Sequence, residues 1–280
     1  MNGMARSSLA AVAIAALLPL TGAAQTKPSG AFALAGPWTR SDPEARFVSP
    51  ASGPGPVEDD PAHPHHGHRE AVAGLPDEAA TPWIADLRNP ILKPWVADVL
   101  RKNAQDQLAG IEDDTELLHC RPDGLPGVLT RRDNVQLLKS ANEVTIFYQL
   151  DHQVRHVYLD VPHSQHPAKS WYGESVGHFE GDSLVVDTIG LNTPPPIDHY
   201  GTPHTDALHV VERYHLTDGG KTLQVDFTVD DPGAFNMAWS GIAHYRRSRA
   251  GYDEFVCAEN NANIWTGKSY PIPVAIPADF

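Results

Sequence analysis

The spacing of hydrophobic residues changes near residue 135. From there on, hydrophobic residues tend to recur at every second position, as in strands with one buried face. The clearest case is the segment 222–230, TLQVDFTVD. The segments predicted as strands are 135–139, 143–150, 154–160, 171–179, 184–190, 207–217, 222–230, 237–247 and 252–258.

Eight or nine successive strands joined by short polar turns predict a mainly β fold. We expect an antiparallel up-and-down barrel, lipocalin-like, with a two-sheet sandwich as the alternative. In an up-and-down barrel, alternate connections lie at opposite ends. The tight turns at 151–153, 180–183, 218–220 and 248–251 should therefore close one end, and the longer connections at 161–170, 191–206 and 230–236 should frame a ligand mouth at the other.

One segment before the strands has helical periodicity. Pro94 suits a first helical turn, and hydrophobic residues recur at helical spacing up to Gly110, a residue typical of a helix end. The sequence thus predicts a single helix over 94–109 that flanks the barrel.

The N-terminal 80 residues lack such patterns. Residues 1–24 combine Arg6, a hydrophobic run of about a dozen residues and small residues before Gln25, which predicts a cleaved signal peptide and a protein of the periplasm or the medium. Residues 25–80 are rich in Pro, Gly and Ala and carry several His, which predicts a flexible leader. A single β-barrel-like domain should fill 81–280.

Composition and net charge limit the kinds of partner that the protein could bind. The chain is 41% hydrophobic, enough for a sizeable core, and its formal net charge of −14 argues against a nucleic-acid surface. No second long hydrophobic run is present, so we expect no membrane span. The oligomeric state cannot be read from the sequence. In an exported protein, Cys120 and Cys257 are expected to form a disulfide.

Glu212 is the first candidate for chemistry. Alternation along 207–217 places it on the same face as Leu208, Val210 and Tyr214. Burial disfavours the charged form of a carboxylate, which suits a general acid or base. The alternative is a structural ion pair with a buried arginine, for which Arg155 and Arg213 are the candidates.

The densest polar cluster, HTDALH, precedes Glu212. His204, Asp206 and His209 could bind Zn²⁺ or Cu²⁺, although this needs a bulge, because 209 lies on the opposite face of an extended strand from 204 and 206. Alternatively, His204 and Asp206 form a proton-transfer pair, with His209 or Arg155 stabilising charge. A plain surface role for these residues also remains open.

Other residues could bind a ligand at the mouth. Those in the long connections are His163, Asp198, His199 and Asp230. Trp171 and Trp239 could stack on a ligand, although core positions inside the barrel are the commoner use of such residues. No Walker loop, dinucleotide fingerprint, HExxH motif or nucleophile elbow is present, which argues against kinases, Rossmann oxidoreductases and serine hydrolases.

Several long motifs resemble those of a family of exported proteobacterial and acidobacterial proteins. They are NPILKPW at 89–95, DHQVR at 151–155, GHFEGDSLVVDT at 177–188, HTDALHVVER at 204–213, VDDP at 229–232 and VCAENN at 256–261. The chain departs from the family at His178, where a Trp is typical. The resemblance implies an exported bacterial protein and assigns it no activity.

These observations favour an exported enzyme that transforms a small organic molecule within a barrel pocket. Glu212, His204, Asp206, His209 and Arg155 would carry out acid/base chemistry, and isomerase, lyase and hydrolase activities stay open. The alternatives are a periplasmic small-ligand-binding protein and a metal-binding protein. No cofactor is required by the sequence.

Overall fold

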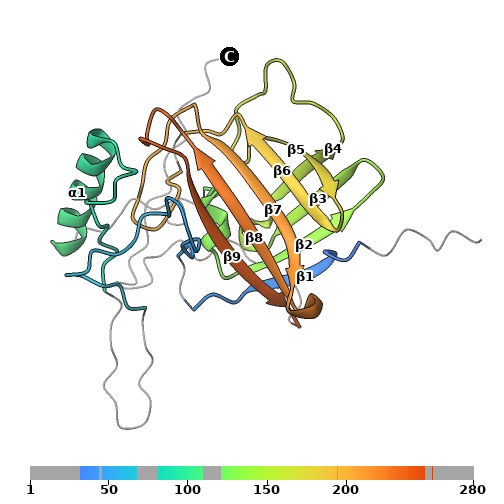
Figure 1. Cartoon of the computed structure of the whole chain (residues 1–280), viewed down its shortest axis with the longest axis horizontal. Coiled ribbons are helices and arrows are strands. Elements are labelled where there is room, and N and C mark those ends of the chain that lie inside the picture. The colour runs from blue at the N-terminus through green and yellow to red at the C-terminus, as the bar shows by residue number, and fades with distance from the viewer. Residues whose placement is uncertain are drawn as a thin grey trace, which may run out of the picture. The chain divides into compact units, whose positions relative to one another are not determined.

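A computed structural model describes residues 32–43, 46–67, 81–109, 121–193, 195–249 and 254, all within the compact unit Phe32–Phe280. The predicted signal peptide, both cysteines and all of the predicted strand 252–258 except residue 254 lie outside the described residues. The described strands form one closed barrel, so the sandwich alternative does not apply (Figure 1). No described helix is long and apolar enough to cross a membrane.

The barrel strands follow one another in chain order, and the last pairs with the first. Their bounds are β1 Gly36–Arg40, β2 Asn134–Lys139, β3 Glu143–Tyr148, β4 Val154–Leu159, β5 Glu174–Glu180, β6 Ser183–Ile189, β7 His209–Thr217, β8 Thr222–Asp230 and β9 Trp239–Arg247. The alternating pattern predicted β2 to β9 closely, and β8 has the predicted bounds. Short 3₁₀ turns are η2 Gly127–Thr130, η3 Leu150–His152 and η4 Asp218–Gly220.

The expected all-antiparallel order is broken once, because β5 pairs with β4 in parallel. The connection 160–173 therefore crosses from one end of the barrel to the other. The turns 181–182 and 218–221 lie at one end, as expected. The turn 149–153 lies at the opposite end, together with the long connections 190–208 and 231–238, which corrects the predicted placement of 151–153.

Part of the expected leader belongs to the barrel. β1 pairs with β2 on one side and with β9 on the other, and Trp38 is fully buried. Phe47 and Val57 also lie in the hydrophobic core. Residues 32–43 and 46–67 are thus not a flexible leader: a few large hydrophobic residues suffice where the barrel supplies the rest of the core.

The helix α1, Pro94–Leu108, agrees with the prediction of one flanking helix. It buries Val96 and Leu100. The indole Nε1 of Trp95 donates to the carbonyl oxygen of Gly233 at 2.9 Å, which fixes the start of α1 to the connection between β8 and β9.

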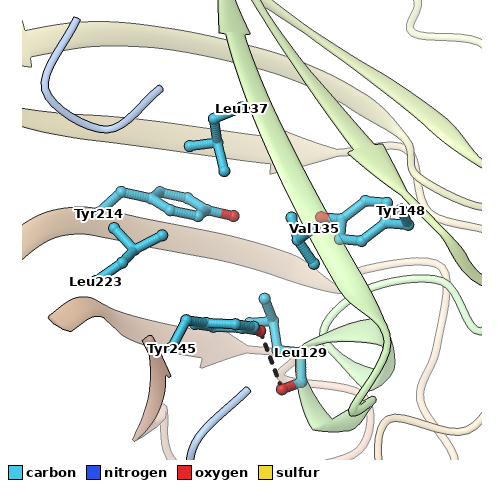
Figure 2. A pocket seen from close by; sticks show the side chains of 7 residues that line it. All are labelled: Leu129, Val135, Leu137, Tyr148, Tyr214, Leu223 and Tyr245. Atoms are coloured by element: carbon cyan, nitrogen blue, oxygen red, sulfur yellow. Dashed lines mark hydrogen bonds between the residues drawn. The ribbon is translucent and has the colours of Figure 1, made fainter. Parts of the chain in front are cut away.

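The barrel interior is filled by side chains. Hydrophobic residues at alternate positions of the strands point inward, as expected from the period of two. Fully buried examples are Leu137, Val144, Ile146, Val157, Leu184, Val186, Val210, Val225 and Val229. The turn η2 is also buried, and its Leu129 carbonyl accepts hydrogen bonds from Arg40 and, as Figure 2 shows, from the hydroxyl of Tyr245.

Candidate functional site

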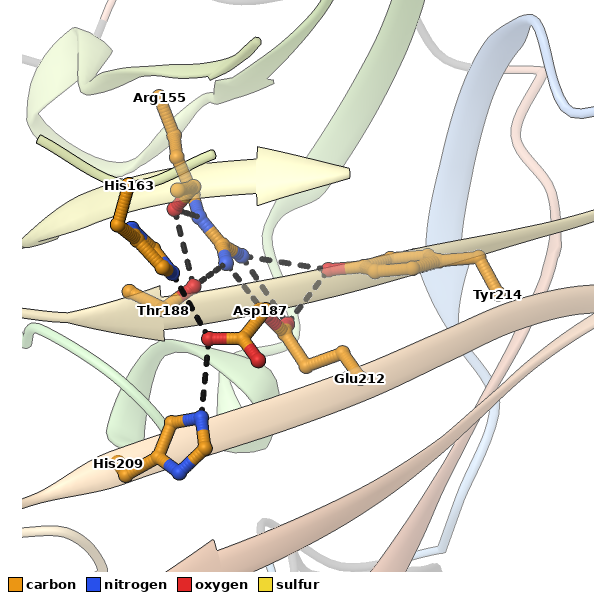
Figure 3. Close-up of polar contacts among 8 residues, drawn as sticks. Arg155, His163, Asp187, Thr188, His209, Glu212 and Tyr214 are labelled. Atoms are coloured by element: carbon orange, nitrogen blue, oxygen red, sulfur yellow. Dashed lines mark hydrogen bonds and ion pairs between the residues drawn. The ribbon is translucent and has the colours of Figure 1, made fainter. Parts of the chain in front are cut away.

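A polar network lies inside the barrel, among β4, β5, β6 and β7 (Figure 3). The Arg155 guanidinium donates from Nη1 to Oε1 of Glu212 at 3.0 Å and from Nη2 to Oε2. Its remaining donors reach Oγ of Ser175 at 2.9 Å, Oγ1 of Thr188 at 2.7 Å and the Tyr214 hydroxyl at 3.5 Å. The Tyr214 hydroxyl donates to Oε1 of Glu212 at 2.7 Å.

This geometry favours the structural alternative for Glu212. Arg155 and Glu212 are both buried, and both carboxylate oxygens are engaged. Next to Tyr214 the interior leaves a cavity of about 10 Å³, close to the space that one water molecule needs. The expectation that Glu212 and Arg155 meet a substrate in a barrel pocket is therefore not supported.

A second polar cluster lies on the outer face of the barrel, over β5, β6 and β7. Oδ1 of Asp187 is 2.9 Å from Nε2 of His163 and 2.9 Å from Nε2 of His209 (Figure 3). Nδ1 of His163 is 3.0 Å from Oε1 of Glu174. Hydrogen bonding from Ser164, followed by that from His163, holds the pKa of Glu174 below its usual value. The cluster thus joins two imidazoles to two carboxylates.

The cluster is open to solvent, and one of its members, His163, belongs to a connection between strands. The exposed fractions are 39% for the His209 side chain and 41% for that of Asp187, against 21% for His163. His163 belongs to the crossover 160–173, which the Lys169–Asp206 ion pair joins to the connection 190–208.

The contact with Asp187 fixes the chemistry of His209. An ionised carboxylate only accepts hydrogen bonds, so Nε2 of His209 must carry the proton in this contact. Among the described residues, Nδ1 of His209 has no hydrogen-bond partner. A neutral ring therefore presents its lone pair at Nδ1, which is the arrangement of a general base oriented by a carboxylate.

The predicted set of His204, Asp206 and His209 does not converge. Asp206 pairs with Lys169, His209 with Asp187, and Nδ1 of His204 lies 2.9 Å from the Thr205 carbonyl. Within the described ranges, no group of three or more His, Cys, Asp or Glu side chains is placed to hold a metal ion. The described residues therefore give no support to a metal site here, and no hydrogen bond joins His204 to Asp206.

Three residues predicted to bind a ligand have other surroundings. Trp239 is 1% exposed and packs against Phe227 and Phe235 in the core, and Trp171 packs at the edge of the core. Asp230 is exposed at the end of β8, opposite His209 in the strand register. Asp230 is thus the one of the three that lies beside the outer-face cluster.

Asp198 and His199 hold the connection 190–208 in place. The Asp198 carboxylate accepts hydrogen bonds from the backbone of Tyr200 and from Thr202. The His199 ring stacks on Trp83 with centroids 5.2 Å apart, and its Nε2 lies 3.0 Å from Oγ1 of Thr130. Burial raises the pKa of Asp198 to about 6 and lowers the pKa of His199 to about 3.

These two shifts predict opposite effects of pH on stability. A His199 pKa of about 3 in the folded state lies below its unfolded value, so its contribution is full above about pH 6.5 and is lost as the pH falls. His199→Phe keeps a ring against Trp83. We expect wild type to lose stability relative to this variant between pH 7 and pH 4, measured as the free energy of urea unfolding.

Asp198→Asn is the control of opposite sign. The raised pKa of Asp198 means that the folded state binds its proton more tightly, so wild type should gain stability relative to this variant as the pH falls from 7 to 4. Parallel pH curves for wild type and both variants would contradict the burial argument.

The sequence missed the carboxylates that orient the histidines. Asp187 and Glu174 lie at outward positions of β6 and β5, where alternation predicts ordinary solvent-facing residues. Only the pairing of β5, β6 and β7 brings them beside His163 and His209.

No model of a known protein family matches the chain, and no curated protein matches it either.

Proposed function

We propose that the protein is an exported enzyme that transfers a proton on a small organic molecule, with His209 as the general base. The observation that carries the proposal is the contact between Nε2 of His209 and Oδ1 of Asp187, which leaves Nδ1 without a hydrogen-bond partner among the described residues, on a side chain that is 39% exposed. The export part of the proposal depends on the sequence of residues 1–24 alone.

His163 and Glu174 support this pair. His163 lies between the two carboxylates, with Nδ1 3.0 Å from Glu174 and Nε2 2.9 Å from Asp187. It also holds the Asp187 carboxylate toward His209. In the proposed step, Nδ1 of His209 takes a proton from the substrate or from a water molecule, and the resulting imidazolium is stabilised by Asp187. Isomerases, lyases and hydrolases all share this step.

The proposal predicts a large loss of turnover in His209→Gln. We would incubate the tag-free protein in D₂O with small keto acids, hydroxy acids, esters and lactones, and follow deuterium uptake and conversion by mass spectrometry. For compounds that react, His209→Gln should lower the rate by roughly 10²–10⁴-fold, the usual contribution of a general base. Asp187→Asn should also lower it, because the wrong tautomer is then favoured.

His178→Gln is the matched control, because His178 is an exposed β5 histidine whose contact is with Glu180. It should leave the rate unchanged. Equal rates in wild type and His209→Gln, or no reaction with any compound, would count against the proposal. A stoichiometric metal in wild type that disappears in His209→Gln would replace acid/base chemistry by metal chemistry at this cluster.

A small-ligand-binding protein is the second candidate, and one feature favours it. An open depression of about 450 Å³, within the usual size of ligand sites, lies between residues 49–58 and residues 86–91. Its polar side chains include Glu58, Asp86 and Arg88. Compounds that bind without reacting, and whose NMR shifts map to this depression, would favour binding over catalysis.

A further inference from the structure

A short pair of antiparallel segments lies outside the barrel sheet. Residues 58–66 and 81–86 run side by side, with Asp59 opposite Ala85 in a β-bridge, and we call this pair the arm. Ala85 belongs to the hydrophobic core and fixes the arm at that point. Further along, side chains of the arm contact the connection 190–208.

A stack of aromatic rings makes that contact. The imidazole of His65 stacks on the indole of Trp83 with centroids 3.5 Å apart, and the imidazole of His199 stacks on the same indole with centroids 5.2 Å apart. Tyr200 packs edge-on against Trp83, and its hydroxyl donates to Oδ1 of Asp59 at 2.8 Å. Trp83 is thus the point at which the arm and the connection hold each other.

Each imidazole makes its hydrogen bond as a neutral ring. Nδ1 of His65 lies 2.7 Å from the Thr81 carbonyl, so this nitrogen carries the proton. Nε2 of His199 lies 3.0 Å from Oγ1 of Thr130, whose own hydroxyl donates to the Gly127 carbonyl. Nε2 of His199 therefore carries the proton as well. In both rings a further proton would have to enter at the other nitrogen.

Charging the two rings would gather positive charge around Trp83. Cζ of Arg46 already lies 6.0 Å from the centre of the indole. An indole face attracts a cation, but two imidazolium ions and a guanidinium around one ring repel one another. The Asp59 carboxylate could offset this repulsion only in part, because Arg46 at 2.6 Å and the Tyr200 hydroxyl already engage it.

Burial opposes the charged form of both rings too. It lowers the pKa of His199 to about 3, and the charges of Arg131 and Arg40 act in the same direction. Burial also lowers the pKa of His65, against the Thr81 carbonyl, which favours the charged form. Both rings therefore bind a proton more tightly once they leave the stack, and a proton favours the open state.

We propose that this stack is an acid-sensitive clasp, which holds the arm on the connection 190–208 at neutral pH and opens as His65 and His199 take up protons. Its contribution is full above about pH 6.5 and is lost as the pH falls toward the folded-state value of about 3 for His199. The clasp is independent of the proposed function, because neither ring belongs to the cluster of His209 and Asp187.

Asp198 acts in the opposite direction. Burial raises its pKa to about 6, so a proton on this carboxyl group favours the folded state. Its hydrogen bonds go to Tyr200 and Thr202, within the connection itself, and not to the arm. Its titration therefore tightens the connection without holding the arm.

Hydrogen–deuterium exchange of the tag-free wild-type protein at pH 7 and pH 5 tests the clasp. The most direct reporter is the backbone N–H of Trp83, which donates to Oε1 of Gln107 on α1 at 2.8 Å. A histidine with a pKa of about 3 in the closed state and about 6.5 in the open state raises the open fraction roughly 20-fold from pH 7 to pH 5. After correction for the intrinsic effect of pH on exchange, the Trp83 amide should show this rise, and the amides of β7 and β8 should not.

The double variant His65→Phe with His199→Phe keeps aromatic rings against Trp83 and removes both titrating groups. Its Trp83 amide should exchange equally at the two pH values. His66→Phe is the control, because His66 is an exposed histidine of the same arm, and it should retain the wild-type rise. A rise that persists in the double variant would overturn the proposal. So would equal exchange at both pH values in wild type, or a rise shared by β7 and β8, and these two outcomes need no variant that folds.

Discussion

Replacing Arg155 with Met is expected to lower the free energy of unfolding by about 3–5 kcal/mol. The change leaves the Glu212 carboxylate buried without its counter-charge, which is the costly way to break an interior ion pair. Ser175 and Thr188 lose a donor as well, although they stay 3.0 Å from each other. Urea unfolding at pH 7, with the slope checked for two-state behaviour, measures the loss.

The double variant separates ion pairing from packing. Arg155→Met combined with Glu212→Leu removes both charges and retains much of the volume, so it should recover most of the loss seen in either single variant. The exposed ion pair of Arg213 with Glu180 provides the control, since its side chains are 40% and 50% exposed. Arg213→Met should cost less than about 1 kcal/mol.

Additive losses in the double variant would contradict this account, because two groups that bond each other directly must show a large coupling energy. A loss at Arg155 no larger than the loss at Arg213 would also contradict it, since the two pairs differ mainly in their burial. Either result would show that the interior network contributes little to the stability of the barrel.

The barrel could be predicted because its interior is hydrophobic and its strands follow one another. Alternation defines β8 without ambiguity and places Glu212 inside, beside Val210 and Tyr214. Of the two arginines expected as partners of Glu212, Arg155 forms the ion pair and Arg213 pairs with Glu180 instead. These features depend only on the period of a strand, which the sequence displays directly.

Two features of the fold are not visible in that period. β1 has only five residues, and it is held in the barrel by its pairing with β2 and β9. Of these two strands, β9 lies near the C-terminal end of the described residues. The direction of β5 is set by the path of residues 160–173, whose length permits either a hairpin or a crossover. Without the register, neither the parallel pair nor the position of 149–153 could be derived.

The sequence identified only part of the candidate site, again because the strand register is not visible in it. His163 and His209 were identified by residue type, but their partners Asp187 and Glu174 look like any outward carboxylates of an acidic protein. His204 and Asp206 are close in sequence, yet each has a different partner in the structure. Proximity along the chain was a poorer guide than the pairing of distant strands.

Trp38→Ala is expected to destabilise the protein by about 3–5 kcal/mol, the range for removing a large aromatic side chain from a core. Trp38 is fully buried in β1, its Nε1 donates to the Leu34 carbonyl at 2.8 Å, and the Arg247 guanidinium lies 3.9 Å from the centre of its ring. The variant thus removes core packing, a hydrogen bond and a cation–π contact together. Thermal and urea unfolding measure the effect.

Trp95→Ala is the matched control, because Trp95 is 40% exposed on α1 and has one hydrogen bond to lose. It should cost about 1 kcal/mol. A small effect at Trp38, similar to that at Trp95, would mean that β1 does not hold the barrel closed. In that case residues 32–43 would behave as the flexible leader that their composition suggests. A large effect at Trp38 alone requires β1 to close the barrel between β2 and β9 in solution.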